Sequence, residues 1–224
     1  MHLCQVMYIK WRALKKNLMG EGDEVPRVNN STLISEEDYL KSELISEVRN
    51  EYVDGQVFAM AGASKNHGRI CQNISRKFGN HLDNSPCEPF SSDMKVKTST
   101  GHYRYPDVLV VCDDNFIEGG YATKTPTILV EVLSRSTRKI DEQDKLMEYI
   151  NIPTLKEYVI IEQYCVDVTV YRKNDDWRSK HYFLGQGVYL ESIDLTLSVE
   201  DIYQRVENED MLEFIQQKES ERTI

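Results

Sequence analysis

The sequence is poor in positive charge relative to negative charge. Lys and Arg number 27 against 37 Asp and Glu, which leaves a formal net charge of -10. This balance argues against a protein coated in basic charge for unspecific nucleic-acid binding, because such proteins carry an excess of Lys and Arg. A local basic face around an acidic site is still compatible with it, since net charge says little about how charge is distributed.

Long apolar runs are absent too. No stretch reaches the ~20 apolar residues that cross a bilayer, so we expect no membrane partner. The first twenty residues lack the continuous apolar centre and the small-residue cleavage site of a secretory signal peptide. These two observations favour a cytoplasmic protein.

Cysteine is scarce and shows no metal-binding spacing. There are five, an odd number, and no CxxC pair occurs. The pattern predicts neither a disulfide framework nor a structural zinc site, and it fits a reducing cytoplasm. Nucleophilic cysteine chemistry is disfavoured as well, because Cys112 stands in an apolar run with no base evident near it. The five are Cys4, Cys71, Cys87, Cys112 and Cys165.

The length and composition fit one globular domain with some decoration. The chain has 224 residues, of which 40% are hydrophobic and 29% charged, so a sizeable core is possible and general disorder is not expected. We expect an N-terminal extension over residues 1–30, a folded domain over 31–206 and a charged, mobile C-terminal tail over 207–224.

Residue periodicity predicts a mixed α/β domain with one central sheet. Asp54-Gly55 between two apolar segments predicts a hairpin, and an apolar stripe of 3.6-residue period from Ser64 to about Leu82 predicts a helix. A peripheral strand or two should follow Trp177, with a short helix opened by Ser198. Further helices are expected at 35–47 and 137–150, and further strands at 90–98, 103–112, 127–133, 157–162 and 166–172.

Two of the expected central strands each contain one acidic residue. Asp107 interrupts YPDVLVV and Glu131 interrupts ILVEVL. A carboxylate inside a buried apolar strand is costly unless it is paired or bound to a metal. Separate buried salt bridges would explain both residues. So would one shared Mg²⁺, which prefers one or two carboxylates together with water and phosphate oxygens.

The helix expected after the Glu131 strand presents further polar groups. Thr137, Asp141, Lys145 and Tyr149 recur every four residues, so they share one helix face. That face can reach the two acids, because the helix starts where the strand ends. On spacing alone, Asp141 and Lys145 are more typical of a solvated salt bridge than of an active site.

Several motifs together resemble one known family. They are EYVDGQVFAMAGAS followed by His67, then FSSDMKV, YRYPDVLVV, TPTILVEVLSRST, the pattern D-x-x-x-K at Asp141 and Lys145, and LKEYVII. These motifs resemble the PD-(D/E)xK nuclease superfamily and, within it, the Uma-type (Uma-two) branch, over about residues 35–205. The resemblance implies a restriction-endonuclease-like core: a central mixed sheet flanked by helices, in the order helix, three strands, helix, strands, with an N-terminal helix and hairpin.

The resemblance also implies site residues. Asp107 is similar to the PD aspartate and Glu131 to the second acid, and these two would hold the metal. The superfamily lysine normally stands two residues after the second acid, where this chain has Leu133. In the Uma-type branch the lysine has migrated to the following helix, which makes Lys145 the expected catalytic lysine. Glu51, Asp93 and His67 match further family positions and are second-tier catalytic candidates, although His67 fits an ordinary core histidine equally well.

The function that the resemblance implies is metal-dependent hydrolysis of nucleic acid. Mg²⁺ or Mn²⁺ would be the cofactor, DNA the expected substrate, and a homodimer the default assembly, because two strands need two sites. An inactive scaffold that binds nucleic acid and a hydrolase of other phosphoesters are the alternatives. Candidate phosphate contacts are Lys65, Arg69 and Arg76, unless they form an ordinary solvated helix face, and Arg135, where relatives usually have proline.

Overall fold

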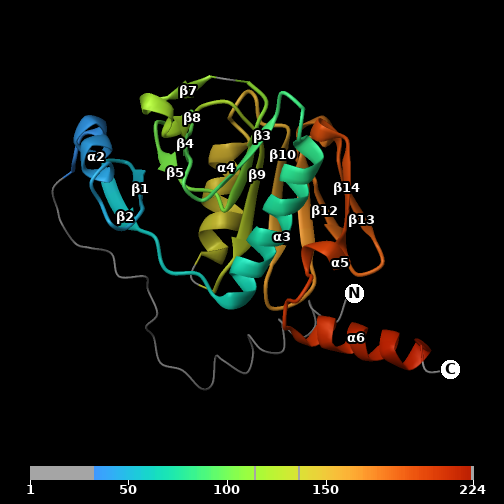
Figure 1. Cartoon of the computed structure of the whole chain (residues 1–224). Helices are drawn as coiled ribbons and strands as arrows, with labels where there is room; N and C mark the ends of the chain where they lie inside the picture. Colours follow the sequence, from blue (N-terminus) through green and yellow to red (C-terminus); the bar gives the residue numbers. More distant parts are fainter. Residues whose placement is uncertain (1–32, 114, 136, 223–224) are drawn as a thin grey trace, which may run out of the picture.

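The computed structural model describes residues 33–113, 115–135 and 137–222 (Figure 1). Its α-helices and π-helix are α2 (Glu36–Glu43), α3 (Lys65–Leu82), the π-helix η2 (Ile140–Lys145), α4 (Leu146–Tyr149), α5 (Val199–Ile202) and α6 (Glu209–Arg222). Its strands are β1 (Asn50–Val53), β2 (Gln56–Ala59), β3 (Glu88–Ser91), β4 (Lys95–Lys97), β5 (Tyr103–Arg104), β6 (Val108–Val111), β7 (Phe116–Ile117), β8 (Ala122–Thr123), β9 (Pro126–Leu133), β10 (Glu157–Glu162), β11 (Val168–Arg172), β12 (Ser179–Tyr182), β13 (Gly187–Leu190) and β14 (Leu195–Ser198). None of the helices in these ranges is long and apolar enough to cross a membrane.

A six-stranded mixed sheet forms the centre, in the order β12-β11-β10-β9-β6-β3. Strands β9 and β10 are parallel, and their neighbours β6 and β11 run antiparallel to them. Every residue of β9 and β10 is buried, as expected for near-continuous apolar strands covered on both faces. The mixed α/β fold with a flanked central sheet is therefore confirmed.

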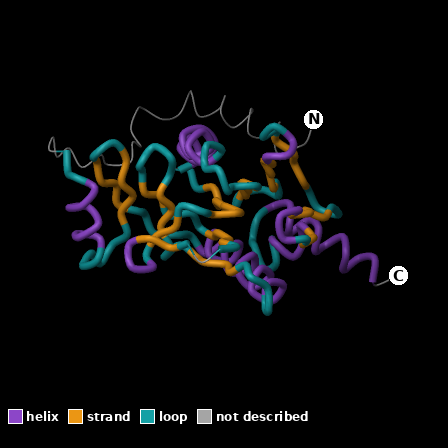
Figure 2. The backbone as a smooth tube through the Cα atoms, turned by 90° about the horizontal axis from the view of Figure 1, so that it is seen from above, coloured by secondary structure: helices purple, strands orange, loops and turns teal. Residues whose placement is uncertain are grey.

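Helices cover the two faces of this sheet (Figure 2). Successive strand residues point to opposite faces, so alternate residues of β9 join different cores. Val130 and Val132 pack with α3, whereas Leu129 and Leu133 pack with Tyr149 of α4. In α3 the buried stripe is the one the sequence predicts, and the Ser64 hydroxyl accepts a hydrogen bond from the His67 backbone N–H at its start.

A second six-stranded sheet, in the order β2-β1-β5-β4-β8-β7, corrects the prediction of one sheet. The expected strands at 90–98 and 103–112 are each divided between the two sheets, after Ser91 and after Arg104. Pro106 lies in the second break, where its missing N–H cannot donate to a neighbouring strand. The break leaves Asp107 immediately before β6 and at the border between the two sheets.

The predicted hairpin forms at Asp54-Gly55. Both residues have positive φ, 50° and 78°, as the tight turn between β1 and β2 requires. A Cβ at Gly55 would come within 3.1 Å of the Leu33 side chain, so glycine also permits this close approach.

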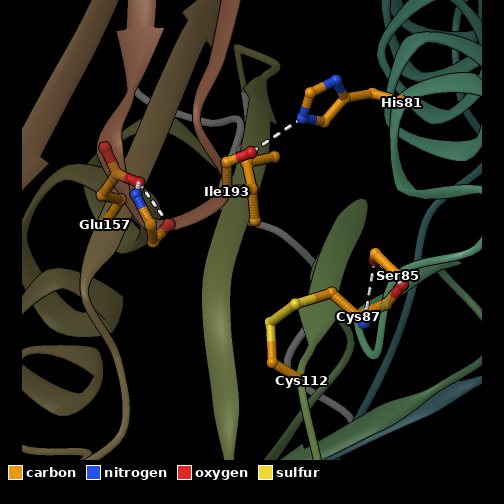
Figure 3. The surroundings of a disulfide bond; sticks show 7 residues. His81, Ser85, Cys87, Cys112, Glu157 and Ile193 are labelled. Atoms are coloured by element: carbon orange, nitrogen blue, oxygen red, sulfur yellow. Dashed lines mark hydrogen bonds between the residues drawn. A yellow bond between two sulfur atoms is a disulfide. The ribbon is translucent and has the colours of Figure 1, made fainter.

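A disulfide joins Cys87 to Cys112 and corrects the prediction of no disulfides (Figure 3). Strands β3 and β6 pair antiparallel with Glu88 opposite Val111, which sets the two flanking cysteines against each other. Cys71 on α3 is a free thiol. The spacing of 25 residues carries no disulfide signal in sequence, because the pairing depends on which strands become neighbours.

Residues 209–222 of the expected charged C-terminal tail form helix α6. Helix α6 buries Met211, and the Asp210 carboxylate accepts a hydrogen bond from the Val166 backbone N–H at 2.6 Å. These contacts attach the first turns of α6 to the domain, and its end extends away from it (Figure 1).

The Tyr203 hydroxyl offers a test of how the end of the domain is attached. This buried hydroxyl donates to the Glu162 carbonyl at 2.7 Å and accepts from the Asp167 backbone N–H at 3.1 Å. Tyr203→Phe leaves both groups without this partner and should lower the free energy of unfolding by about 1–3 kcal/mol. Tyr189→Phe is the control, because its hydroxyl bonds Asp194 at the surface, and should change it by less than about 0.5 kcal/mol. Equal values from urea unfolding would contradict the assignment.

Candidate active site

The candidate site lies where several elements of the described chain meet. It uses the end of β9, the residue before β6, the first turn of α3, the helices η2 and α4, and β1 of the second sheet. Val108 pairs with Val130 across β6 and β9, and this register sets Asp107 opposite Glu131. Glu131 therefore lies on β9 and Asp107 immediately before the neighbouring strand β6, which brings the two acids side by side although Asp107 is outside the strand that the sequence predicts.

Lys145 occupies the centre of a buried cluster of carboxylates. Its ammonium lies 2.9 Å from Glu131 Oε1, 3.2 Å from Glu51 Oε1 and 3.2 Å from Asp141 Oδ1. Its side chain is 7% exposed. The solvated Asp141–Lys145 pair considered from sequence spacing is therefore wrong, and the lysine bridges three acids inside the protein.

The electrostatics of Glu131 follow from this burial. Burial disfavours its charged form, and the neighbouring Lys145 opposes that effect, whereas the charges of Asp141, Asp107 and Glu51 add to it. The net result is a pKa of Glu131 well above the ordinary value. The Tyr149 hydroxyl donates a hydrogen bond to Glu131 Oε1 at 3.0 Å and holds the carboxylate in place.

Asp107 is held from two sides. Its Oδ2 accepts the Val132 backbone N–H at 2.8 Å, and His67 Nε2 lies 3.1 Å from the same oxygen. Burial favours a neutral His67, but the hydrogen bond and charge of Asp107 outweigh it and raise the pKa of the ring. His67 therefore contacts a candidate site residue, which distinguishes it from an ordinary core histidine.

Glu51 reaches the cluster from the second sheet. It accepts from Arg104 at 2.8 Å and from the Tyr105 backbone N–H at 3.3 Å. The buried Arg104 also makes two bonds to Glu148, at 2.6 and 3.0 Å. Although burial opposes it, the charges of Lys145 and Arg104 keep the pKa of Glu51 below the ordinary value.

Other sequence candidates lie outside this cluster. Asp93 stands in the turn between β3 and β4, is 71% exposed and pairs with Arg49. Lys65 and Arg69 both bind Glu207, at 2.7 and 3.0 Å, and do not form a free basic face. Two more candidates make surface contacts: Arg76 donates to the Gln204 side chain, and Arg135 lies over the Tyr164 ring.

Comparison with known proteins identifies the family. The family model Uma2, described as "Putative restriction endonuclease", matches residues 36–205. The chain belongs to the Uma2 family. Two relatives from Synechocystis sp. (strain ATCC 27184 / PCC 6803 / Kazusa) are named "Uncharacterized protein slr1290" and "Uncharacterized protein sll1609". The first is 38% identical over 76% of this chain and 91% of its own length, and the second is 33% identical over 66% and 86%.

A solved structure supports the fold. It is described as the crystal structure of a "putative nuclease belonging to DUF820" from Anabaena variabilis ATCC 29413. Its TM-score is 0.61 at 18% identity, and the match covers 73% of this chain and 96% of the other. The Uma2 chain thus has a nuclease-like fold.

Sequence reasoning did not assign several residues of the site in this Uma2 chain. Asp141 and Tyr149 were visible on one helix face, but only the structure shows that this face is buried against Glu131. No sequence pattern marks Arg104 as a site residue, because it lies beside the break between two strands. The free Cys71 lies near His67, one helical turn along α3.

The burial of Lys145 generates a stability prediction. Lys145→Met removes the cation that three buried carboxylates share, so the free energy of unfolding at neutral pH should fall by about 3–5 kcal/mol. Lys139→Met is the matched control, because Lys139 is exposed on the same segment. Its effect should stay within about 0.5 kcal/mol. Similar losses for both variants in denaturant unfolding would show that Lys145 is not buried among the acids.

Glu131 generates a prediction about pH. Its pKa is raised in the folded state, so the folded protein binds this proton more tightly than the unfolded chain does. This contribution to stability is present below the ordinary value of 4.5 and is lost as pH rises through the folded pKa.

The measurement is the free energy of unfolding against pH in the presence of a chelator. The difference between wild type and Glu131→Gln separates this residue from Glu51, whose pKa is lowered, and from Asp141, whose pKa is raised as well. The variant should gain stability relative to wild type as pH rises. A difference that does not change with pH would contradict the raised pKa.

Proposed function

We propose that this Uma2 protein is a divalent-metal-dependent endonuclease that hydrolyses phosphodiester bonds of nucleic acid, most simply of DNA. The observation that supports it best is the excess of buried carboxylate over cation at the end of β9. Four acids gather there, and the permanent cations in contact with them are Lys145 and Arg104, of which Arg104 is shared with Glu148. The acids are Glu51, Asp107, Glu131 and Asp141.

The donor set fits a hard divalent cation. Glu131 on β9 and Asp107, just before the neighbouring strand β6, both offer carboxylate oxygens, and ligands of this kind suit Mg²⁺ or Mn²⁺. Burial raises the pKa of Glu131, and the negative charges of Asp141 and Asp107 add to this effect. A cation at this place would relieve the repulsion between the acids. When bound, such an ion neutralises phosphate charge and lowers the pKa of a water ligand.

Lys145 acts in this proposal as a fixed positive charge. Burial opposes its charged form, but Glu131, Glu51 and Asp141 outweigh burial and raise the pKa of the ammonium. A protonated amine cannot take a proton from water, so the role of general base is disfavoured. Orientation of water and stabilisation of developing phosphate charge are the roles left to it.

The surrounding residues position this machinery. The backbone N–H of Val132 and the ring of His67 fix one oxygen of Asp107, and Tyr149 fixes one oxygen of Glu131. The Arg104 side chain fixes Glu51, which in turn contacts Lys145. Held in this way, the acids keep their orientation when a phosphate group arrives, which is the preorganisation that metal-assisted hydrolysis uses.

Binding of nucleic acid requires a change at the start of α3. Lys65 and Arg69 are paired with Glu207, so a phosphate group would have to replace that carboxylate. Arg135, on the loop after β9, is exposed and follows Glu131 in the next segment of the chain. A homodimer that brings two sites to the two strands of DNA remains part of the proposal.

The inactive scaffold is the second candidate function. The apolar Leu133 at the usual lysine position supports it, since that departure removes the superfamily's ordinary arrangement. Carboxylate-dependent metal binding separates the two candidates, because an inactive scaffold needs no metal at Asp107 and Glu131.

Asp107→Asn tests the proposed function. The substitution keeps the shape of the side chain but removes a charged ligand, so Mg²⁺- or Mn²⁺-dependent cleavage should fall by at least about a hundredfold. Asp176→Asn is the control, because Asp176 is 88% exposed and pairs only loosely with Arg178 at 3.8 Å, and it should cleave at the wild-type rate.

The assay measures cleavage of single-stranded, double-stranded and structured DNA and RNA, with and without divalent metal. Metal binding by calorimetry runs beside it for both variants. Wild-type protein that binds no metal and cleaves none of these substrates supports the scaffold. Full cleavage by Asp107→Asn removes Asp107 from the site.

A further inference from the structure

A second group of possible metal ligands adjoins the candidate site. His67, Cys71 and Asp107 each offer one ligand atom, and these atoms all lie within 4.8 Å of one another. Cys71 Sγ lies 3.5 Å from His67 Nδ1, and His67 Nε2 lies 3.1 Å from Asp107 Oδ2. One ring thus stands between a thiol and a carboxylate.

Local structure fixes this arrangement. His67 and Cys71 are four residues apart on α3, so they share one face of the helix. Asp107 comes from the border of β6, and the Val132 backbone N–H holds it in place. Two elements distant in sequence therefore supply the three ligands, and all three are largely shielded from water.

The ligand chemistry differs from that of the Asp107–Glu131 pair. A thiol, an imidazole and a carboxylate suit Zn²⁺ or Co²⁺, whereas Mg²⁺ prefers oxygen alone. Tetrahedral bonds of about 2.0–2.3 Å place ligand atoms about 3.3–3.6 Å apart, so side-chain rotations must draw together the three atoms, which now lie within 4.8 Å of one another. Only one ring nitrogen of His67 can bind the ion, and the contact on that nitrogen is then replaced.

We propose that His67, Cys71 and Asp107 form a second cation site that takes a thiophilic divalent ion such as Zn²⁺. Three protein ligands leave one tetrahedral position for water. The Cys71 thiol loses its proton to solvent when the sulfur binds the ion. Asp107 belongs to both ligand sets. A thiophilic ion that takes Asp107 as a ligand therefore leaves Glu131 without it as a partner for Mg²⁺, so the thiophilic ion and Mg²⁺ exclude each other. This second part rests on the proposed function, whereas binding of the thiophilic ion does not.

A nucleophilic role for the same three residues is less well supported. The Cys71 thiol, the His67 imidazole and the Asp107 carboxylate follow one another as the nucleophile, the base and the acid of a catalytic triad do. Burial, with the charges of Asp107 and Glu131, raises the pKa of the Cys71 thiol strongly. The free thiol therefore stays protonated at neutral pH, and a metal ion is what makes the thiolate accessible.

Titration with Co²⁺ tests the site, because Co²⁺ bound to thiolate absorbs in the near ultraviolet and spectroscopically silent Zn²⁺ does not. Wild-type protein should develop this band at one equivalent, and excess Zn²⁺ should remove it. Cys71→Ser should lose the band. His67→Gln should weaken Co²⁺ binding by at least about tenfold.

The matched control is His81→Gln. His81 lies on the same helix but bonds the Ile193 carbonyl at 2.7 Å, so this variant should bind Co²⁺ as wild type does. Cys71 is half-buried, and if Cys71→Ser unfolds the protein, the variant Cys71→Ala is used in its place. A wild-type band in either Cys71 variant, or equal Co²⁺ affinity for the two histidine variants, overturns the site.

Competition separates this inference from the proposed function. Excess Mg²⁺ should weaken the apparent Co²⁺ affinity of wild type, and Glu131→Gln should reduce that effect. A Co²⁺ band that depends on Cys71 but does not respond to Mg²⁺ overturns mutual exclusion and leaves the second site intact. Metal-dependent cleavage without a Cys71-dependent band overturns the second site and leaves the proposed function intact.

Discussion

The buried ammonium of Lys145 is the interaction on which the rest of the site depends. It contacts acids from three places: Glu131 at the end of β9, Glu51 in the second sheet and Asp141 in its own helix. One cation therefore joins both sheets and the helix between them. Buried charges of one sign repel strongly, so Lys145 stabilises the packing of these elements by lying among the acids. The same arrangement leaves more negative than positive charge, which favours binding of a further cation.

The break between β5 and β6 brings the second sheet to this cluster. Arg104 ends β5, Asp107 precedes β6, and the Tyr105 backbone N–H between them donates to Glu51. A continuous strand over 103–112 would keep these residues in one sheet and could not present Arg104 to Glu51 and Asp107 to β9 together. The irregular backbone at Pro106 is thus a requirement of the site, in the way that interruptions of regular strands commonly accompany functional residues.

The sequence predicts those features that depend on local pattern. A charge inside an apolar run is a local signal, so Asp107 and Glu131 stand out, and the Asp54-Gly55 turn and the stripe of α3 are equally local. Other features depend on which distant strands become neighbours, and residue periodicity does not predict that. They are the division into two sheets, the Cys87–Cys112 disulfide and the ion pairs of Arg104. Lys145 shows the limit most clearly, because an i,i+4 spacing from Asp141 is the same in a solvated pair and in a buried one.

The departure at Leu133 has a physical explanation in the same cluster. Leu133 stands two residues after Glu131, so it points to the same face of β9, where it packs in a core with Tyr149 and Tyr158. A lysine at that position would need to bury its charge among these rings. The helix that follows supplies the ammonium instead, and Asp141 and Lys145, four residues apart in its π-helical turn over Ile140–Lys145, are both buried there. The cation 2.9 Å from Glu131 thus comes from a helix that packs over the strand, and Leu133 contributes to the core on which that helix rests.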